Sequence, residues 1–300
     1  MADKKDIDFT YTTLDEIFRL SIGESADFSG ARYNGNFSMS LEEAQQAKHQ
    51  FMMDQLNIQA GNKVLDMGCG WGPFLKFATG RGARAIGLTL SDGQLAACKK
   101  NGFDVFIKDV RYVTPQDFGG FDAVVSVGAF EHFCSLEEYK KGRQEMIYSS
   151  FFKTVADLLP PGGRFYLQTM TFGKNMISDE AIDINSPHDS DSYLIALMAK
   201  HFPGSWLPYG SEMILHNAEP FFKLVNISSG RLDYIETTIQ WKKRIRKFNF
   251  KKYLLFFSLI PKFLFNQEFR HKLAVFRASA NKKCFERELI DHFRIVFEKK

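Results

Sequence analysis

The sequence predicts an α/β fold in which a doubly wound, Rossmann-like parallel sheet carries a helical cap or insertion. The first observation is a short apolar run, Val64, Leu65 and Met67, followed by glycines at alternate positions through Gly72. Such a run suits a strand that is buried on both faces and ends in a tight turn before a helix. The second is the alternation of expected strands and helices up to residue 171, which is typical of parallel βαβ units. The third is the end of that alternation at about residue 172. Residues 173–220 are largely polar with scattered Gly and Pro, which indicates an insertion that covers the site.

The composition is that of an ordinary globular protein. With 300 residues, 45% of them hydrophobic and 25% charged, the chain is long enough for one large domain or one domain plus a cap. A net charge of +4 is too mild to indicate a nucleic-acid partner. The 31 Phe residues leave two interpretations open, dense core packing and a pocket for a bulky apolar substrate.

The sequence contains no pattern that predicts export, a membrane span or a metal site. Residues 1–8 hold no apolar signal region, and no apolar stretch approaches the roughly 18 residues that a span requires. The four cysteines are widely scattered, and the histidines at 188, 201 and 216 lack metal-ligand spacing. We therefore expect a cytoplasmic protein with reduced cysteines and no metal ion.

Two helices are expected before the first strand. Residues 11–20 read as a helical start, and a glycine-containing loop follows. Residues 40–56 form the second helix, because Ser40 is a suitable N-cap, Glu43 completes a capping box, and no Gly or Pro interrupts the run. Residues 1–60 are therefore expected to be an N-terminal helical segment that covers the site.

The expected sheet occupies residues 61–171. Its strands are residues 63–67, 83–88, 105–108, 121–127 and 164–169, and its helices are residues 74–79, 91–100 and 151–159. Residues 172–300 form a third unit, a substrate cap in which residues 227–241 return to the sheet as strands. Ligands of doubly wound sheets collect at the carboxyl ends of the strands. The polar residues at or just beyond those ends are Asp66, Thr89, Asp109 and Glu131.

The glycine loop after the first strand predicts a bound cofactor. Gly68, Gly70 and Gly72 can adopt φ > 0 and carry no Cβ, so a ligand can lie against the backbone. A dinucleotide-binding loop would be Gly-x-Gly-x-x-Gly, whereas this chain has Asp-x-Gly-x-Gly-x-Gly, in which the carboxylate of Asp66 could order the loop and attract a cation. The pattern resembles the first motif of S-adenosylmethionine (SAM) methyltransferases. A tight turn without a ligand is the alternative.

Further motifs extend this resemblance over most of the chain. They are residues 41–48 (Leu-Glu-Glu-Ala-Gln-Gln-Ala-Lys), 64–72, 87–91 (Gly-Leu-Thr-Leu-Ser) with Gln94, and 125–132 (Val-Ser-Val-Gly-Ala-Phe-Glu-His). In this order they resemble the cyclopropane fatty acid synthase and mycolic acid methyltransferase family. The resemblance implies SAM as the cofactor. The residues expected around it are Tyr33, Asp66, Gly68, Gly70, Thr89, Gln94, Asp109 and Val110.

The resemblance also implies what Glu131 does. Methyl transfer to an electron-rich alkene leaves a carbocation that must be stabilised and then lose a proton, and a carboxylate suits both tasks. In the family the matching Glu holds a bicarbonate together with a Tyr, a His and a Cys. Tyr234 matches the Tyr, but Gln168 stands at the His position and no Cys lies near Tyr33. We expect Glu131 and Tyr234 to be catalytic, with weak bicarbonate dependence and a methyl-branched or methylene product; a Glu131 that only shapes the pocket is the alternative.

A basic stretch suggests contact with a lipid surface. Residues 242–252 carry seven Lys or Arg and no acid, and residues 253–265 are rich in Leu and Phe, with Pro261 arguing against one continuous helix. Adjacent cationic and apolar segments suit peripheral binding to an anionic membrane. The alternative is an apolar helix packed on the cap with a solvated basic face.

The sequence therefore predicts a SAM-dependent C-methyltransferase acting on an unsaturated apolar chain, either fatty acyl or isoprenoid. A small-amine N-methyltransferase and a non-catalytic lipid-binding protein on the same scaffold are the alternatives. Intact Asp66, Gln94 and Glu131 favour an enzyme.

Overall fold

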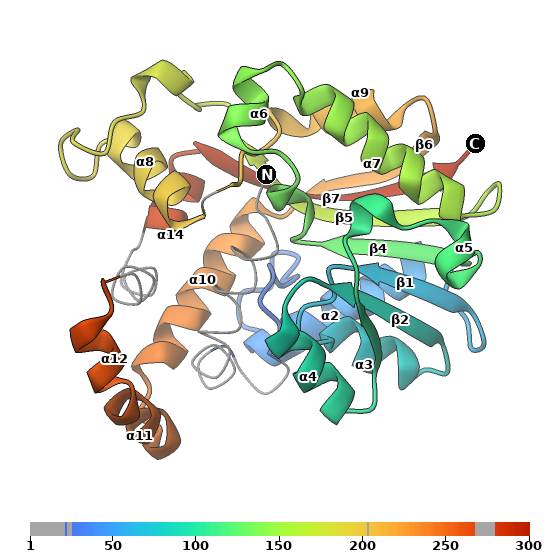
Figure 1. The fold of residues 1–300 in the computed structure, drawn as a ribbon, viewed down its shortest axis with the longest axis horizontal. Coiled ribbons are helices and arrows are strands. Elements are labelled where there is room, and N and C mark those ends of the chain that lie inside the picture. Colours follow the sequence, from blue (N-terminus) through green and yellow to red (C-terminus); the bar gives the residue numbers. More distant parts are fainter. Residues whose placement is uncertain (1–21, 23–25, 203, 268–279) are drawn as a thin grey trace.

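A seven-stranded sheet forms the centre of the computed structural model, which describes residues 22, 26–202, 204–267 and 280–300 (Figure 1). The strands are β1 (Lys63–Met67), β2 (Arg84–Thr89), β3 (Asp104–Ile107), β4 (Ala123–Val127), β5 (Arg164–Phe172), β6 (Phe222–Ser229) and β7 (Ile290–Lys299). Their order is β3-β2-β1-β4-β5-β7-β6. Neighbours from β3 to β5 are parallel, and β7 is antiparallel to both β5 and β6. The predicted α/β class is confirmed.

Helices accompany the sheet along the whole described chain. Those up to β5 are α2 (Leu41–Gln55), α3 (Pro73–Thr79), α4 (Asp92–Lys100), η1 (Val110–Tyr112), α5 (Pro115–Phe118), η2 (Phe130–His132), α6 (Leu136–Lys140) and α7 (Gln144–Leu158). Those after β5 are η3 (Asp179–Ala181), α8 (Asp191–His201), α9 (Gly210–Ala218), α10 (Arg231–Arg246), α11 (Phe250–Ser258), α12 (Ile260–Phe265) and α14 (Ala280–Glu286). Ser40 and Glu43 form the expected capping box of α2. The helix expected at residues 11–20 lies outside the described residues.

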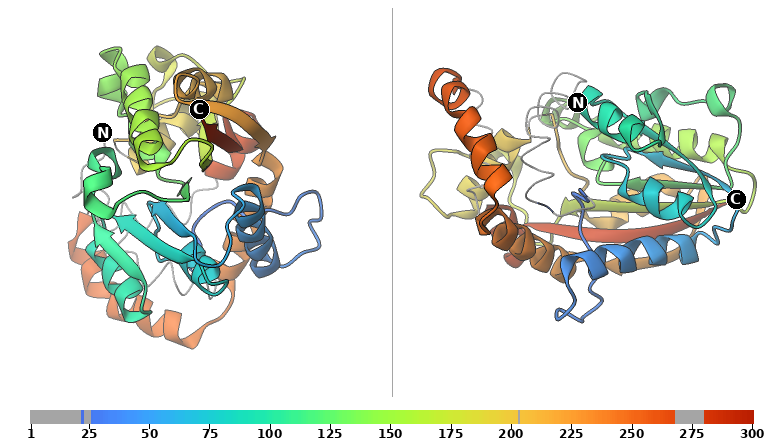
Figure 2. Two further views of the ribbon diagram at one scale, coloured as in Figure 1. Left: turned by 90° about the vertical axis from the view of Figure 1, so that its right-hand side faces the viewer. Right: turned by 90° about the horizontal axis from the view of Figure 1, so that it is seen from below.

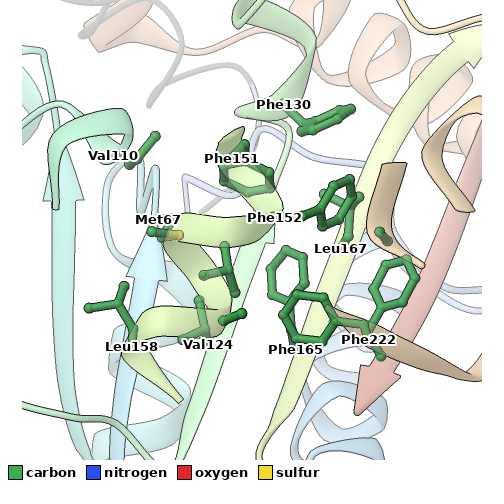
Figure 3. Close-up of a cluster of buried hydrophobic side chains, with 14 of the residues drawn as sticks. Met67, Val110, Val124, Phe130, Phe151, Phe152, Leu158, Phe165, Leu167 and Phe222 are labelled. Carbon is green, nitrogen blue, oxygen red and sulfur yellow. The ribbon is translucent and has the colours of Figure 1, made fainter. Parts of the chain in front are cut away.

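The sheet separates two hydrophobic cores. Successive side chains of a strand point to opposite faces, so Leu65 packs in the core of α7, whereas Val64 packs with residues of α2 and α3. Figure 2 shows α7 and α2 on opposite sides of the sheet. In the α7 core, aromatic rings pack against one another across helix and strands, as Figure 3 shows for Phe151, Phe152, Phe165 and Phe222. Much of the phenylalanine content therefore serves dense packing, the first of the two interpretations.

The C-terminal part corrects one sequence prediction. Of residues 227–241, which were predicted to return as strands, only 227–229 do so, as the end of β6; α10 follows from Arg231. β-Branched residues of this stretch have strand propensity, yet its buried residues Tyr234, Thr237 and Trp241 recur at helical spacing. The strand that returns to the sheet between β5 and β6 is instead β7, which the sequence pattern did not predict.

A cap of α8, α10 and α14 packs around a further hydrophobic cluster. This cap cluster joins Leu194 of α8, Tyr234 of α10 and Phe285 of α14 to Leu41 of α2. Because β6 and β7 belong to the same sheet as β1, residues 172–300 supply both the cap and one edge of the sheet. The unit boundaries at residues 60 and 171 stay a prediction. Within the described ranges, no helix combines the length and the apolar character needed to cross a bilayer.

Candidate active site

The chain passes from β1 to α3 through glycines with left-handed backbone angles. The φ angles of Gly68, Gly70 and Gly72 are 101°, 55° and 79°, values at which a Cβ is strained. A Cβ on Gly68 would lie 2.6 Å from the Cβ of Ala129. A Cβ on Gly70 would meet no described atom within 4 Å, and Gly70 lines a cavity. The loop therefore leaves its backbone open to a ligand.

This glycine-loop cavity has a volume of about 160 Å³ and lies where β1, β2 and β4 end. It is lined by all but one of the residues expected at the cofactor, namely Asp66, Gly68, Gly70, Thr89, Gln94, Asp109 and Val110. The exception is Tyr33, whose amide donates to Asp233 Oδ1 and whose side chain is buried in the cap cluster. Tyr33 lines neither cavity of the site, and its contact with a cofactor stays a prediction.

Asp66 is the acidic residue that precedes the loop. It is buried, and its Oδ1 has no hydrogen-bond partner in the part of the chain that the structure describes. Burial, with the charge of Asp27 acting in the same direction, raises the pKa of Asp66 to about 7. A buried carboxylate oxygen without a partner is costly, so the cavity suits a ligand that brings a hydrogen-bond donor or a positive charge.

Two hydrogen-bonded pairs occupy more of the cavity wall. Thr89 Oγ1 donates to the side-chain oxygen Oε1 of Gln94 at 2.6 Å. The backbone N–H of Gln94 donates to Ser91 Oγ at the start of α4. Asp109 Oδ1 accepts from the amide and from Nε of Arg111, at 3.0 Å and 2.7 Å. A ligand amino group at Asp109 would therefore share this carboxylate with Arg111.

A buried charged cluster in the same cavity was not predicted from the sequence. Asp27, Lys48 and His49 form it. Lys48 Nζ donates to Asp27 Oδ2 at 2.7 Å, and His49 Nε2 lies 3.0 Å from the same oxygen. Burial alone would raise the pKa of Asp27, but Lys48 and His49 hold it well below its ordinary value. Lys48 is the last residue of the motif at residues 41–48, and its place in that motif could have marked it as a site residue. Asp27 lies in a loop that contains no motif, so the sequence did not single it out.

A second cavity of about 110 Å³, which we call the carboxylate cavity, adjoins the first. The residues that line both cavities are Phe28, Ser29, Gly128 and His132. The apolar wall of the carboxylate cavity contains Met170, Phe172, Ile195, Met198, Phe202, Trp206, Leu207 and Ile290, and its polar wall contains Glu131, Gln168, Tyr234 and His292. A largely apolar chamber thus lies beside the cavity that suits a cationic ligand.

Glu131 is buried in the polar wall of the carboxylate cavity. Its Oε1 accepts from the amide of Met170 at 2.9 Å, whereas Oε2 has no partner among the described residues. Burial raises the pKa of Glu131 to about 7, and the hydrogen bond from Met170 opposes that rise. One oxygen is fixed and the other is unpartnered, so Glu131 is an oriented acceptor for positive charge.

Comparison with known protein families decides the identity of this arrangement. The family described as mycolic acid cyclopropane synthetase matches residues 1–263. The chain belongs to this family. Membership confirms the family expected from the motifs, and with it the enzyme class, a SAM-dependent methyltransferase.

Two relatives and one solved structure illustrate the likeness. Cyclopropane mycolic acid synthase 2 of Mycobacterium tuberculosis is 32% identical over 236 residues, which are 77% of this chain and 76% of the relative. Hydroxymycolate synthase MmaA4 of the same species is 30% identical over 242 residues, 79% of this chain and 76% of the relative. The structure of the cyclopropane synthase MmaA2 from Mycobacterium tuberculosis has a TM-score of 0.77 at 24% identity over 99% of both chains, which shows a shared fold.

The polar wall contains Gln168 and Tyr234, the two residues compared with the family's His and Tyr in the sequence. Both polar atoms of the Gln168 side chain are hydrogen-bonded. Its Nε2 donates to the carbonyl of Gly30 at 2.9 Å, and its Oε1 accepts from the Tyr166 hydroxyl at 2.9 Å. Tyr234, the second expected catalytic residue, lies with its ring centre 5.0 Å from that of His292 on β7. His292 was missed because β7 was not predicted.

Proposed function

We propose that this synthetase-family protein transfers a methyl group from SAM to an unsaturated apolar chain, fatty acyl or isoprenoid, held in the carboxylate cavity. The observation that carries the proposal is Glu131, an oriented and unpartnered carboxylate in a mainly apolar cavity beside the glycine-loop cavity. Such a group stabilises a carbocation on the chain far more than it stabilises the neutral alkene, and this difference accelerates the reaction.

The residues of the glycine-loop cavity fit SAM. Asp66 Oδ1 lacks a partner and would accept from the ligand's ammonium group, and the open backbone at Gly70 accommodates a ligand lying against the loop. Thr89 and Gln94 would hold the ribose hydroxyls, and Asp109 would accept from the adenine amino group. When bound, SAM supplies an electrophilic methyl group on a positively charged sulfur.

The carboxylate cavity fits an apolar chain. Side chains from β5, α8 and the loop that follows α8 line it, including Met170, Ile195 and Trp206. These apolar side chains lower the dielectric around the reacting carbons, which strengthens the electrostatic effect of Glu131. Because Gln168 stands at the family's His position with both polar ends occupied, we expect weak bicarbonate dependence and a methyl-branched or methylene product.

The test uses SAM with a tritiated methyl group and three separate acceptor pools: unsaturated phospholipids, prenyl diphosphates and small amines. The proposal expects label in the phospholipid or prenyl pool. Label confined to the amines would indicate an N-methyltransferase. Binding of SAM with no label in any pool would indicate a non-catalytic lipid-binding protein.

We further propose that α11, α12 and the end of α10 rest on an anionic membrane surface. Figure 1 shows α11 and α12 at one end of the molecule, away from β1 and β2. Phe257 is 74% exposed and Phe265 is 88% exposed, which is unusual for apolar rings unless they contact a partner. The exposed basic residues beside them are Lys242, Lys243, Arg246, Lys247 and Lys251.

The two other basic residues of the stretch have structural roles. Arg244 pairs with Glu42 on α2. Lys252 is buried, and its Nζ donates to the carbonyls of Arg244, Ile245 and Lys247 at the end of α10. The surface offered to lipid is therefore smaller than the sequence alone suggested.

Vesicle co-sedimentation tests the membrane proposal. Each basic residue near an anionic surface contributes about 1 kcal/mol, so replacing Lys243, Lys247 and Lys251 by Gln should weaken binding to phosphatidylglycerol vesicles roughly a hundredfold at low salt. The matched control replaces three exposed lysines elsewhere: Lys76, Lys100 and Lys223. Equal binding by both triple variants, or wild-type binding that does not respond to salt, would identify the basic stretch as an ordinary solvated face.

A further inference from the structure

We propose that His292 is the catalytic base that takes the proton from the substrate cation, a role that Gln168 cannot fill. This inference rests on the proposed function of the carboxylate cavity. It assigns a residue on β7, which lies outside every motif that marked the family.

The register of the sheet places His292 on the wall that Gln168 belongs to. Met170 pairs with His292 between the antiparallel strands β5 and β7, and Gln168 pairs with Arg294. Residues two apart on a strand share a face, and directly paired residues of neighbouring strands also share a face. Gln168 and His292 therefore enter the same cavity from adjacent strands, and both line it.

The Nε2–Cε1 edge of the His292 ring lies next to Gly30, which also lines the cavity. A Cβ built on Gly30, another residue of the cavity lining, would lie 3.3 Å from His292 Nε2 and 3.2 Å from its Cε1. The other nitrogen, Nδ1, lies on the side of Gly230 and has no hydrogen-bond partner among the described residues. The amide of Met170, directly opposite His292, is the group that fixes Glu131.

The surroundings keep the imidazole neutral. The charges of Arg294 on β7 and Lys48 on α2 act on His292, the ring of Tyr234 on α10 lies beside it, and Glu131 on η2 lines the same cavity. Burial, followed by the charges of Arg294 and Lys48, lowers the pKa of His292 well below its ordinary value. A neutral imidazole has one nitrogen that can accept a proton, and we assign this role to Nε2. A weak base is sufficient here, because a carbocation with adjacent C–H bonds is a very strong acid.

The proton transfer balances without any further reagent. After methylation the substrate has a new C–C bond and a positive charge on the neighbouring carbon. A C–H bond next to that carbon breaks, and its electron pair neutralises the cation as a new C–C bonding pair. The lone pair of His292 Nε2 takes the proton, Glu131 stabilises the resulting imidazolium, and water removes the proton when the product leaves.

The first test is a binding measurement that needs no turnover. Protonated decyldimethylamine can donate a hydrogen bond to His292, whereas decyltrimethylammonium carries the same charge without a donor. Wild type should bind the first about tenfold more tightly than the second, as expected for one charge-assisted hydrogen bond, and His292→Leu should lose the preference. His132→Leu is the comparison, because His132 also lines this cavity and its Nδ1 is 2.8 Å from Ser205 Oγ. A preference kept by His292→Leu, lost only in His132→Leu, or absent from wild type would overturn the inference.

The second test follows the fate of the cation with tritiated SAM and two acceptors in separate reactions, dioleoylphosphatidylglycerol vesicles and a prenyl diphosphate. His292→Gln should convert label from the deprotonated product to an alcohol heavier by one water, because water captures a cation that has no base beside it. His216→Gln, an exposed substitution on α9, should leave the products unchanged. An unaltered product ratio in His292→Gln would overturn the inference. Absence of label from every acceptor, with the ammonium preference intact, would overturn the proposed function and leave His292 as a hydrogen-bond acceptor in the cavity.

Discussion

Replacing Glu131 by Gln is the substitution that separates charge from shape in the carboxylate cavity. The variant keeps an oxygen that can accept from the Met170 amide, while the unpartnered Oε2 becomes a neutral amide nitrogen. A preorganised group of this kind is worth roughly 3 kcal/mol, so turnover should fall about a hundredfold or more. SAM affinity should change little, because Glu131 lines only the carboxylate cavity.

The pH dependence gives the same substitution a second signature. The pKa of Glu131 is raised to about 7, so wild-type turnover should rise as the pH increases through 7 and the carboxylate ionises, and the Gln variant should lack this rise. A raised carboxyl pKa means that the folded state holds the proton more tightly than the unfolded state does. The stabilisation from that proton is present below about 4.5 and is lost as the pH rises through 7.

As the pH rises through 7, the turnover of wild type should therefore increase while its free energy of unfolding decreases. Between pH 5 and pH 8 the free energy of unfolding of wild type should fall by up to about 3 kcal/mol, because the Glu131 carboxyl loses its proton. Glu131→Gln has no such proton and should not show this fall. Tritium transfer measures the activity, and urea unfolding at the two pH values measures the stability. Glu145→Gln on the exposed surface of α7 is the control and should change neither. Turnover of Glu131→Gln within about threefold of wild type, under roughly 1 kcal/mol, would reduce Glu131 to a residue that shapes the cavity.

Three other substitutions test the cofactor loop and the cap. Gly70→Val should abolish SAM binding in calorimetric titration, whereas Gly142→Val, at a similar φ of 69° away from both cavities, should bind SAM normally; binding by both would mean that the loop is misassigned. Asp233→Asn should lower the free energy of unfolding by about 3–5 kcal/mol, because it leaves Arg294 buried without its ion-pair partner at 2.9 Å; a loss no larger than that of the exposed pair in Asp157→Asn, about 0.5 kcal/mol, would refute this. Lys252→Met should destabilise the protein by about 2 kcal/mol in urea unfolding, since it removes the donor to the last carbonyls of α10, and the exposed Lys251→Met should not; equal effects would contradict a capping role.

The sequence was sufficient to predict the parts of the molecule in which local chemistry dictates conformation. Gly68 and Gly70 occupy positive φ angles that other residues adopt only with strain, and Ser40 with Glu43 fixes the start of α2. For the same reason most of the expected cofactor residues, from Asp66 to Val110, line one cavity. These residues lie at the end of a strand or within a few residues of it, so predicting the strand also predicts where they lie.

Long-range packing determined the parts that could not be predicted. Thr237 and its β-branched neighbours favour a strand by propensity, but α10 forms because its buried face packs in the cap cluster and Asp233 binds the backbone of Tyr33 and Asn34. His292 comes to the cavity through the pairing of β7 with β5, some 120 residues away in sequence. Asp27 becomes meaningful only beside Lys48. No local pattern encodes such pairings.

The reaction proposed for this protein is methyl transfer to a carbon of an unsaturated apolar chain. It is tested most directly by mass spectrometry of the product formed from SAM with a deuterated methyl group and the acceptor pool that takes up label. Deuterium is expected in a new carbon branch attached to a carbon of the former double bond, in wild type and, at a rate about a hundredfold lower, in Glu131→Gln. Deuterium on nitrogen or oxygen, or at a carbon remote from the double bond, would contradict it.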